Sequence, residues 1–434
     1  MAPEKDFEIA IIGGGIAGAT LAIALKNHGI KCQIYEQGHA FSEIGAGVAF
    51  SPNSLSAMDV CDKNLRGAFE KVATHNQWPS KKNVYFDVMD GTPDFYGRDQ
   101  TEPIFTLENE QGQNAVHRAH FMDEISKLIP IETCHFRKHL DSIAEDEKME
   151  KLRLTFHDGT SAEADGVVGC DGIKSRVREI IVGEKHPSAK AKYTHMYGYR
   201  GVIPMEKAVD IIGEERATNS CVWIGPNAHI LSYPVDGGDT YNMFAAVCDT
   251  NEWPDEDHLT LPAKKEDAIK DFANFAPAIK KKLTMVEDNL DRWALFDLGD
   301  NPVPYMHKGR VAIMGDAAHA TTPHHGAGAG FCIEDSALMS AILGDERVKK
   351  PADVEAAFAA FDASRRERGQ WLVQSSRRNS ELMDFRAKDV GRDLKKIEKE
   401  MKERFGKIWN YDINGAINDA KGDLGKRLAK MSRA

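Results

Sequence analysis

A glycine-rich turn near the N-terminus constrains the fold of this chain more than any other feature. An apolar, β-branched run over Phe7–Ile12 is typical of a buried strand, and the sequence GGGIAG follows it at residues 13–18. Helical character then extends over Ile16–Lys26, and a second strand is predicted over Lys31–Tyr35, directly before Glu36. This order predicts a β-α-β unit with G-x-G-x-x-G at its first turn and an acidic residue after its second strand.

Each glycine of this motif meets a separate requirement of dinucleotide binding. Gly13 permits a tight turn, Gly15 leaves space for a pyrophosphate, and Gly18 allows the helix to pack closely on the strand. The N-terminus of the helix offers free N–H groups and a positive dipole to the phosphates. Glu36 is suited to accept hydrogen bonds from the ribose of an unphosphorylated adenosine, so the unit predicts binding of FAD or NAD. The nucleotide contacts that we predict here are Gly13, Gly15, Ile16, Ala17, Gly18 and Glu36.

Composition and charge exclude several broad classes of protein. The chain has 434 residues, 42% hydrophobic and 28% charged, which is ordinary for a globular protein of two or three domains. Its 56 basic and 67 acidic residues give a net charge of -11, which argues against broad binding to nucleic acid or anionic lipid. Its seven cysteines form no C-x-x-C pair, so free thiols in a reducing compartment are expected. Because no signal peptide or long apolar run is present, we predict a cytoplasmic protein without a membrane span.

A second informative segment reads DGVVGCDGIKSRVR at residues 165–178. A strand is predicted over Ala164–Cys170 and ends at Asp171-Gly172. Ser175, Arg176 and Arg178 are predicted to open a helix. The segment therefore predicts a strand that passes through an Asp-Gly turn into a helix.

A third segment, residues 309–335, repeats this organisation later in the chain. A strand predicted over Val311–Met314 leads into Gly315-Asp316. A loop rich in proline and glycine follows at Pro323–Gly330, and an apolar helix is predicted from about Ala327 to Leu343. This segment therefore predicts a second strand that leads through a loop into a helix.

These three motifs, in this order, resemble those of the flavoprotein aromatic hydroxylases, a family typified by p-hydroxybenzoate hydroxylase. The family carries a G-x-G-x-x-G turn, a DG motif that matches Asp171-Gly172 and a GD motif that matches Gly315-Asp316. The resemblance extends from Phe7 to about Leu343 and is greatest to salicylate hydroxylases. Shorter stretches also look like the family's flavin-contact segments, namely Gly45-Ala-Gly47-Val48 with Pro52-Asn53, and Val116-His-Arg118.

The resemblance implies non-covalent FAD as the cofactor. Asp316 corresponds to a residue that hydrogen-bonds the ribityl chain, and Arg118 to one that lies along the pyrophosphate or ribityl region. The glycines of residues 326–330 leave room for the isoalloxazine ring, and the helix that begins there directs its positive end at the flavin. Asp171 and Arg176 remain divided between contacts to FAD, contacts to the pyridine nucleotide and a structural cap. The further flavin contacts that the resemblance implies are Gly47, Val48, Arg118, Asp171, Asp316, Gly326, Ala327, Gly328 and Ala329.

The implied fold is α/β: a Rossmann-like FAD-binding domain with an inserted antiparallel-sheet substrate domain and a helical C-terminal region. The FAD-binding domain is expected to comprise residues 1–75, 106–180 and 285–345, the substrate domain residues 76–105 and 181–284, and the C-terminal region residues 346–434. No second Rossmann fingerprint is present, so NADH or NADPH is expected as a transient electron donor. The strands predicted in the substrate domain are Tyr193–Pro204, Ser220–Ile224, His229–Val235 and Tyr241–Cys248.

Three residues are candidates for substrate binding and catalysis: Arg200, Tyr233 and His324. Arg200 lies in Tyr199-Arg-Gly201, where salicylate-hydroxylase-like members carry the same Arg-Gly pair, and a surface salt bridge is its alternative role. For Tyr233 the alternative is core packing. Because ring activation requires a phenolate, an acceptor for the phenolic proton is also expected, with His229, Tyr233 and His324 as candidates.

Histidines gather around the GD motif without the spacing of a metal site. His319 and His324 are five residues apart with Thr-Thr-Pro between them, unlike the i, i+4 pair of a helical zinc site, so we predict no metal. Two nearby residues depart from the family's pattern. His325 stands where related sequences often have glutamine, and Leu298 stands where many have arginine after the aspartate that matches Asp297.

The leading hypothesis is an FAD monooxygenase that hydroxylates a phenolic carboxylate with NADH or NADPH and O2, most similar to salicylate hydroxylase. With salicylate, attack at the carboxylated carbon would expel carbon dioxide and leave catechol. Alternatives in the same class are hydroxylases of 3-hydroxybenzoate, kynurenine or a polyketide phenol. Alternatives outside it are a flavin-binding regulatory protein without turnover and a flavin reductase or oxidase that makes only peroxide. A monomer or homodimer is expected, with no nucleic acid or membrane as partner.

Overall fold

We call the part of the molecule that contains the predicted β-α-β unit the nucleotide-binding half, after that prediction. It is organised around a mainly parallel sheet. The computed structural model describes residues 5–41, 47–94, 102–146 and 150–433, so Gly45 of the sequence analysis lies outside the described residues. Six strands lie in the order β18-β19-β11-β1-β2-β7, and all neighbours are parallel except β18 and β19. Their bounds are β1 Glu8–Ile12, β2 Lys31–Glu36, β7 Cys134–Phe136, β11 Gly166–Gly169, β18 His307–Lys308 and β19 Val311–Ile313.

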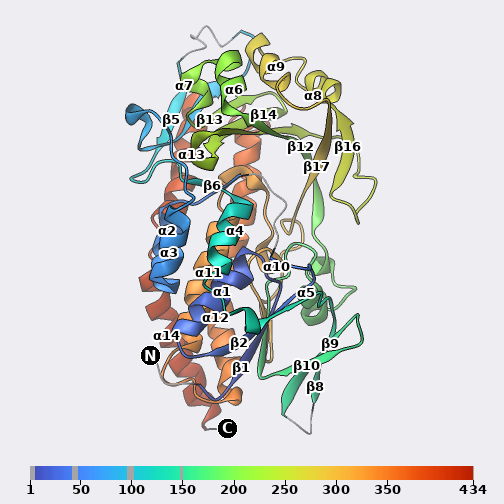
Figure 1. Cartoon of the computed structure of the whole chain (residues 1–434), viewed down its shortest axis with the longest axis vertical. Helices are drawn as coiled ribbons and strands as arrows, with labels where there is room; N and C mark the ends of the chain where they lie inside the picture. Colours follow the sequence, from blue (N-terminus) through green and yellow to red (C-terminus); the bar gives the residue numbers. More distant parts are fainter. Residues whose placement is uncertain (1–4, 42–46, 95–101, 147–149, 434) are drawn as a thin grey trace.

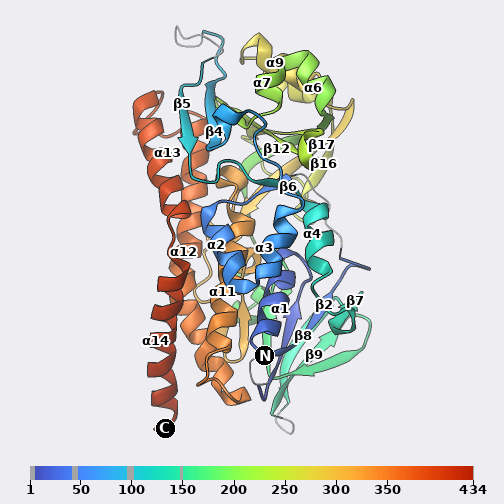
Figure 2. The same cartoon turned by 60° about the vertical axis from the view of Figure 1, so that its left-hand side comes forward.

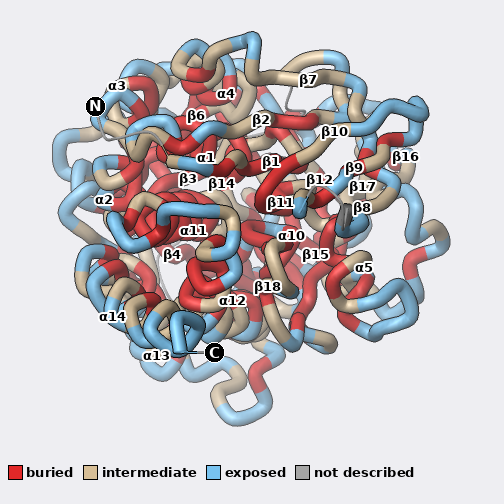
Figure 3. Tube along the Cα trace, turned by 90° about the horizontal axis from the view of Figure 1, so that it is seen from below, coloured by how far each residue is buried: buried red, intermediate tan, exposed pale blue. Residues whose placement is uncertain are grey.

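The predicted β-α-β unit lies at the centre of this sheet. Helix α1 (Ile16–Asn27) connects β1 to its parallel neighbour β2. Gly13 has a φ of +101°, and a Cβ atom there would lie 2.5 Å from the carbonyl oxygen of Cys170, so only glycine fits this turn. Helix α1 packs against α11 (Gly328–Leu343), the predicted apolar helix, and both helices are buried along most of their length. Figure 3 shows β1 and α11 as buried segments in the middle of the molecule.

Shorter elements surround this sheet. Helices α2 and α3 lie beside α1 and α11, and α4 lies near β6, as Figures 1 and 2 show. The helices are α2 Pro52–Cys61, α3 Lys63–Glu70, α4 Arg118–Ser126, α5 Arg176–Val182 and α10 Asp316–His319. Two small antiparallel sheets add β3 Gly47–Ala49 with β6 Ala115–His117, and β8 Leu140–Asp146 with β9 Lys151–Phe156 and β10 Ser161–Ala164.

The second half is an eight-stranded sheet in the order β16-β17-β12-β15-β14-β13-β4-β5. All four predicted strands of this region are present, and apart from the parallel pair of β13 and β4 the neighbours are antiparallel. The strands are β4 Val84–Asp90, β5 Phe105–Glu108, β12 Lys192–Pro204, β13 Cys221–Gly225, β14 Ala228–Val235, β15 Thr240–Cys248, β16 Thr260–Lys264 and β17 Asn289–Asp297. The helices are α6 Met205–Ile212, α7 Glu214–Ala217, α8 Lys265–Asp271 and α9 Pro277–Leu283.

Strand β17 extends this sheet further along the chain than the sequence analysis expected. It pairs with β12 from Lys192↔Asp297 to Tyr199↔Arg292, beyond the expected boundary at residues 284 and 285. The chain therefore returns to the nucleotide-binding half after Asp297. The expected boundary differs because β17 follows the short helix α9, and no local signal separates a strand that adds to one sheet from a strand that begins another.

Side-chain alternation gives the eight-stranded sheet two different faces. On β12, Tyr197 and Tyr199 belong to a core that also contains Phe272, Phe275 and Ile279 from around α8 and α9. Arg200, the next residue, therefore points to the opposite face, toward the nucleotide-binding half. Figure 1 shows the helices α6–α9 above the sheet and the nucleotide-binding half below it.

Three C-terminal helices run along one side of both halves (Figure 2). They are α12 Val354–Met383, α13 Leu394–Trp409 and α14 Ile413–Met431. Helix α13 buries Ile397, Met401 and Phe405 against the body of the protein. Among the described residues, no helix combines the length and hydropathy that crossing a bilayer requires.

Candidate active site

A cavity of about 830 Å³ runs between the two halves of the molecule, and both halves line it. We call the part formed by the three glycine-rich motifs the nucleotide end, and the part formed by the eight-stranded sheet the sheet end. The nucleotide end is lined by Gly13, Gly15, Ile16, Ala17, Glu36, Gly47, Val48, Arg118, Asp171, Asp316, Gly326, Ala327, Gly328 and Ala329. The sheet end is lined by Phe86, Arg200, Leu231, Tyr233, Asn242, Phe244 and Trp293.

Almost every predicted nucleotide contact lies in the wall of the nucleotide end; Gly18 is the exception. A Cβ atom on Gly18 would lie 2.0 Å from the carbonyl oxygen of Gly13, so this glycine allows α1 to approach β1 and does not line the cavity. Glu36 accepts hydrogen bonds from the N–H groups of Gly14 and Gly38, both at 2.6 Å. These bonds hold the carboxylate at the cavity wall, at the end of β2, where a ribose hydroxyl can donate to it.

The nucleotide end fits FAD in its chemistry. Asp316 is exposed to the cavity, and no hydrogen bond to its carboxylate is present within the described chain, so it is available as an acceptor. Gly326 has a φ of +61°, which lets the chain turn sharply before α11 begins at Gly328. The first turns of α1 and α11 both line the cavity, so free N–H groups and two positive helix ends face it. That environment suits a pyrophosphate and an electron-rich flavin.

Asp171 both caps a helix and lines the cavity. Its carboxylate accepts hydrogen bonds from the Ser175 hydroxyl at 2.5 Å and from the N–H group of Val177 at 3.0 Å. Burial raises the pKa of Asp171, although these hydrogen bonds oppose the shift. Arg176 pairs with Glu179 and Glu184 at the edge of the cavity. Asp171 of the DG motif therefore has the structural capping role that the sequence analysis considered. Because Asp171 and Arg176 also line the cavity, this role does not exclude a contact with the nucleotide.

Arg178 makes an internal connection that the sequence analysis did not identify. Its side chain is fully buried and donates hydrogen bonds to the carbonyl oxygens of Ile173, Ala189 and Ala317, at 2.5, 3.1 and 3.0 Å. Ala317 belongs to α10, so this one guanidinium joins the DG turn to the GD turn. Only the tertiary structure shows that the two motifs are neighbours.

A buried ionic network that includes α11 and α12 contacts the GD turn. Asp335 of α11 accepts hydrogen bonds from the Gly315 N–H at 2.9 Å and the Arg365 Nε at 2.6 Å, and it contacts His319 Nε2 at 2.7 Å. Burial alone would raise the pKa of Asp335, but Arg365 and His319 lower it to about 2. Arg365 also pairs with Glu334 at 2.7 Å. The sequence signal that could have revealed this network is the adjacent acidic pair Glu334 and Asp335 within the otherwise apolar helix α11.

At the sheet end, Arg200 is a cation without an anionic partner. Its guanidinium lies 3.9 Å from the centre of the Trp293 ring, and no carboxylate among the described residues forms an ion pair with it. Burial lowers the pKa of Arg200, and the nearby Arg118 adds to that effect, while Tyr233 opposes it. The surface salt bridge considered for Arg200 is therefore not present, and the side chain is placed to receive an anion.

Tyr233 connects the sheet end to the nucleotide end. Its hydroxyl donates a hydrogen bond to the Gly47 carbonyl oxygen at 2.8 Å, and a Cβ atom on Gly47 would lie 2.6 Å from the Tyr233 ring. Burial raises the pKa of Tyr233, with Arg200 opposing that shift. Tyr233 is thus closely packed, which agrees with the core-packing role considered for it as the alternative, and it also lines the cavity.

His324 and His229 do not line this cavity but a smaller one beside it. The smaller cavity shares Phe86, Leu231 and Phe244 with the sheet end and continues toward α12 and α13. His324 contacts the Thr322 hydroxyl at 2.8 Å through Nδ1, while its Nε2 is buried without a hydrogen-bond partner in the described structure. Burial lowers the pKa of His324 well below its usual value, so this ring is neutral at physiological pH.

The two departures from the family's pattern lead to the C-terminal helices. His325 turns away from the cavity, contacts the Ser375 hydroxyl of α12 at 2.9 Å and packs edge-on against Phe405 of α13. Leu298 is buried, and Asp297 takes a bidentate guanidinium from Arg377 of α12 at 2.7 and 2.6 Å. Asp297, which is followed by leucine here and by arginine in many relatives, thus pairs with a cation from a distant helix.

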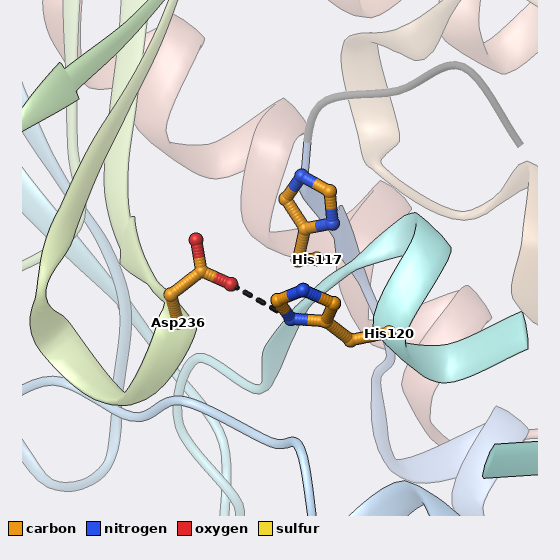
Figure 4. Close-up of side chains that lie close together, drawn as sticks. All are labelled: His117, His120 and Asp236. Atoms are coloured by element: carbon orange, nitrogen blue, oxygen red, sulfur yellow. Dashed lines mark ion pairs between the residues drawn. The ribbon is translucent and has the colours of Figure 1, made fainter. Parts of the chain in front are cut away.

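His117, His120 and Asp236 come together where α4 meets the turn after β14 (Figure 4). Their nearest ligand atoms lie within 4.8 Å of one another, and His120 Nδ1 is 3.0 Å from Asp236 Oδ1. The two histidines flank Arg118 at the N-terminus of α4, where the dipole and the guanidinium disfavour a further cation. We therefore describe the group as a polar contact between the two halves.

Comparisons with known proteins agree with this geometry. A family model described as an FAD binding domain matches residues 6–376. An FAD-dependent monooxygenase of Monascus ruber is 41% identical over 433 residues, which cover 98% of each chain. A 6-methylsalicylate 1-monooxygenase of Aspergillus terreus is 39% identical over 429 residues, which cover 98% of this chain and 94% of that protein. The structure of a salicylate hydroxylase with its substrate matches with a TM-score of 0.84 at 29% identity, over 96% of this chain and 98% of that chain.

Proposed function

The chain belongs to the FAD-dependent monooxygenases of the aromatic hydroxylase type, and from this premise we propose that its substrate is a phenolic carboxylate like salicylate. FAD is the cofactor, and NAD(P)H and O2 are the co-substrates typical of these enzymes. With salicylate, the balanced reaction consumes NAD(P)H, O2 and two protons and yields catechol, carbon dioxide, NAD(P)+ and water.

One observation carries the proposed substrate class: the unpaired Arg200 guanidinium at the sheet end. A partly buried cation costs free energy unless an anion accompanies it, and here Trp293 supplies only a ring face. A carboxylate fits the planar fork of arginine with two hydrogen bonds. The aromatic and aliphatic side chains of Phe86, Leu231 and Phe244 then surround the ring that carries the carboxylate.

The residues of the cavity have separate tasks in this reaction. When bound, FAD supplies the activation of oxygen that hydroxylates the ring. Arg200 orients the substrate, and Tyr233 holds the Gly47 backbone in the cavity wall. The N-terminus of α11 would stabilise negative charge on a bound flavin by about 0.3–2 kcal/mol. A histidine beside the ring accepts the phenolic proton, which makes the ring carbon electron-rich.

The proposal is tested by purification followed by a substrate screen. We expect a yellow protein with non-covalent FAD, whose oxidation of NADH or NADPH is stimulated by salicylate or a close analogue. Product analysis should give a hydroxylated ring, with catechol from salicylate. A protein that binds FAD but shows no stimulated turnover would support the regulatory alternative. Stimulated oxidation that yields only hydrogen peroxide would support the reductase or oxidase alternative.

A ring that carries an apolar substituent is a second candidate, favoured by the smaller cavity. That cavity has mainly apolar walls, with Met383 and Met401 from the C-terminal helices opposite Val222 and Leu231. Methionine side chains adapt easily to an added group. The named activity of the Aspergillus terreus relative, on 6-methylsalicylate, is consistent with this candidate. Alkyl-substituted salicylates and phenols without a carboxylate therefore belong in the same screen.

A further inference from the structure

We propose that Asp384 is a positioning residue, which orients His229 so that its Nε2 accepts the phenolic proton of the substrate. This inference rests on the proposed function, because it concerns the base of that same reaction. It selects His229 from the three candidate acceptors and adds a residue from the C-terminal helices to the site.

The first argument is the place of His229 on strand β14. Residues two apart on a strand share a face, so His229 lies on the same face as Leu231 and Tyr233, which line the larger cavity. His229 lines the smaller cavity, which lies beside the larger one and shares Leu231 and Phe244 with it. A ring bound at the sheet end beside Leu231 and Phe244 therefore lies next to the smaller cavity that His229 lines.

The second argument is the orientation of the His229 ring. Its Nδ1 lies 2.7 Å from Asp384 Oδ1, and the side chains are 4% and 0% exposed, so water does not compete for this contact. An ionised carboxylate only accepts hydrogen bonds, so Nδ1 carries the proton and Nε2 keeps its lone pair. The dyad thus prepares Nε2 as a base.

The third argument is that Asp384 is itself held ionised and in place. Its second carboxylate oxygen accepts hydrogen bonds from the Ser380 hydroxyl at 3.1 Å and from Arg386 at 3.2 Å, and the Cys248 thiol lies at 3.5 Å. Burial alone would raise the pKa of Asp384, but His229 and Arg386 hold it below its usual range. The residue caps the C-terminus of α12, which fixes its backbone.

The other titratable neighbours of His229 do not compete for this task. The centroid of the His324 ring is 5.1 Å from that of His229, with 62° between the ring planes, and burial keeps His324 neutral. Burial raises the pKa of the Cys248 thiol, so it also carries no charge. Arg386 is the remaining charged neighbour, and it contacts Asp384. Among these groups, the ionised Asp384 is the one that stabilises a positive charge on His229.

The proposed step is a proton transfer without a redox component. The phenolic O–H bond breaks, an Nε2–H bond forms, and the electron pair of the broken bond stays on the phenolate oxygen. The resulting imidazolium is paired with the Asp384 carboxylate, and the phenolate donates electron density into the ring. After hydroxylation the proton returns to the product oxygen.

The same helix provides a matched control. Asp362 of α12 contacts His307 Nδ1 at 2.9 Å, which is the same kind of pair, but His307 lies on β18 in the nucleotide-binding half. Neither residue lines either cavity. Asp362→Asn therefore repeats the chemical change of Asp384→Asn on the same element, away from the substrate.

The experiment measures ionisation of a bound phenol. 5-Nitrosalicylate is titrated into each FAD-loaded protein, and the absorbance of its ionised form is followed against pH. We expect Asp384→Asn to raise the midpoint of ionisation by about one pH unit or more, which is a tenfold loss of phenolate stabilisation. Asp362→Asn should leave the midpoint unchanged. With a hydroxylated substrate, Asp384→Asn should lower the rate about tenfold near neutral pH and approach the parent rate at high pH.

Two further variants separate positioning from a merely structural role. His229→Gln cannot accept the proton and should raise the midpoint as Asp384→Asn does, and the double variant should show no additional rise. If Asp384→Asn does not fold, the His229→Gln midpoint decides the question. A midpoint equal to the parent's in either variant, or additive rises in the double variant, overturns the inference. If the parent hydroxylates no phenolic acid, the proposed function fails instead.

Discussion

At the nucleotide end of the cavity the wall is largely backbone from short motifs, whereas at the sheet end it is made of side chains from five separate strands. Helix N-termini and glycine turns suit the phosphates and ring edges that every FAD molecule presents. The nucleotide end therefore does not need to change when the substrate changes. The sheet end takes one or two side chains each from β4, β12, β14, β15 and β17. Substitution of single side chains there can change the substrate while the nucleotide end stays intact. Cofactor and substrate recognition are therefore structurally separable.

Helix α12 braces both ends. Arg365 contacts Asp335 next to the GD turn, and Arg377 contacts Asp297 where the chain leaves the sheet. Asp384, the C-cap residue of the helix, contacts His229 at the smaller cavity. Figure 2 shows this helix running past both halves. The two ends are thus built differently but supported by one element. The following predictions test how far they are independent.

The largest effect on the free energy of unfolding is expected for Arg365, the α12 residue that supports the nucleotide end. Arg365→Met removes the guanidinium that pairs with both buried carboxylates, so that Asp335 keeps only His319 and Glu334 only Arg368 as ionic partners. This loss should lower the free energy of unfolding by about 3–5 kcal/mol. Arg366→Met is the control, because Arg366 is a partly exposed neighbour on the same helix and its loss should cost less than about 1 kcal/mol. Denaturant titrations measure both. Equal losses would show that Arg365 does not brace the turn.

The next largest effect is expected at the sheet end. Arg200→Ala should weaken binding of the carboxylate substrate by about 2–5 kcal/mol, roughly thirtyfold to several thousandfold, without loss of FAD. Arg200→Lys should recover part of the affinity, because lysine keeps the charge but not the planar fork. Arg292→Ala serves as the control, since Arg292 lies over Tyr197, whose side chain packs on the opposite face. Flavin absorbance reports the binding, and unchanged affinity in Arg200→Ala would place the carboxylate elsewhere.

Asp316→Ala provides the converse test at the nucleotide end. Loss of a charged acceptor should weaken FAD binding by about 1.5–3 kcal/mol while the fold is retained. FAD affinity is measured by reconstitution of the apoprotein, with Arg200→Ala as the reference that should bind FAD normally. The conclusion that cofactor and substrate recognition are separable is contradicted if Asp316→Ala binds FAD as tightly as the parent does, or if Arg200→Ala loses FAD.

Acid should weaken the network beneath the GD turn. The pKa of Asp335 is lowered to about 2 in the folded protein, below that of an unfolded aspartate. Its contribution, on the order of 2 kcal/mol, is therefore complete above about pH 4 and is lost as the pH falls toward 2. Unfolding free energies between pH 6 and 3 should decline less steeply in Asp335→Asn than in the parent. Parallel declines would contradict the assignment.

The smallest effect is expected where the two halves touch outside the cavity. His120 and Asp236 form a pair whose side chains are 54% and 24% exposed, so His120→Gln should change the free energy of unfolding by less than about 1 kcal/mol. Added salt should reduce even that difference. A larger loss, or an effect on FAD and substrate binding, would show that the halves are coupled at this contact.

The sequence by itself determined the elements and the order in which they occur. The β-α-β unit, the DG and GD turns and the strands β12–β15 were predictable because each depends on a short stretch, through glycine geometry, capping or alternation of side chains. The same local signals placed Arg200 and Tyr233 on the sheet. They did not show where the sheet ends, because the pairing of β17 with β12 joins segments far apart in the chain.

Only the tertiary structure decided which side chains meet. His229 and Asp384 are 155 residues apart, Asp297 and Arg377 are 80 apart, and Arg178 and Ala317 are 139 apart. A charged residue in a strand or helix has the same local pattern whether it faces solvent, an ion-pair partner or a substrate. Its partner is set by the packing of whole elements, and here by the path of α12 past both ends of the cavity. The chemistry of the sheet end therefore became visible only when the folded chain placed an unpaired arginine in one cavity and an oriented histidine in the cavity beside it.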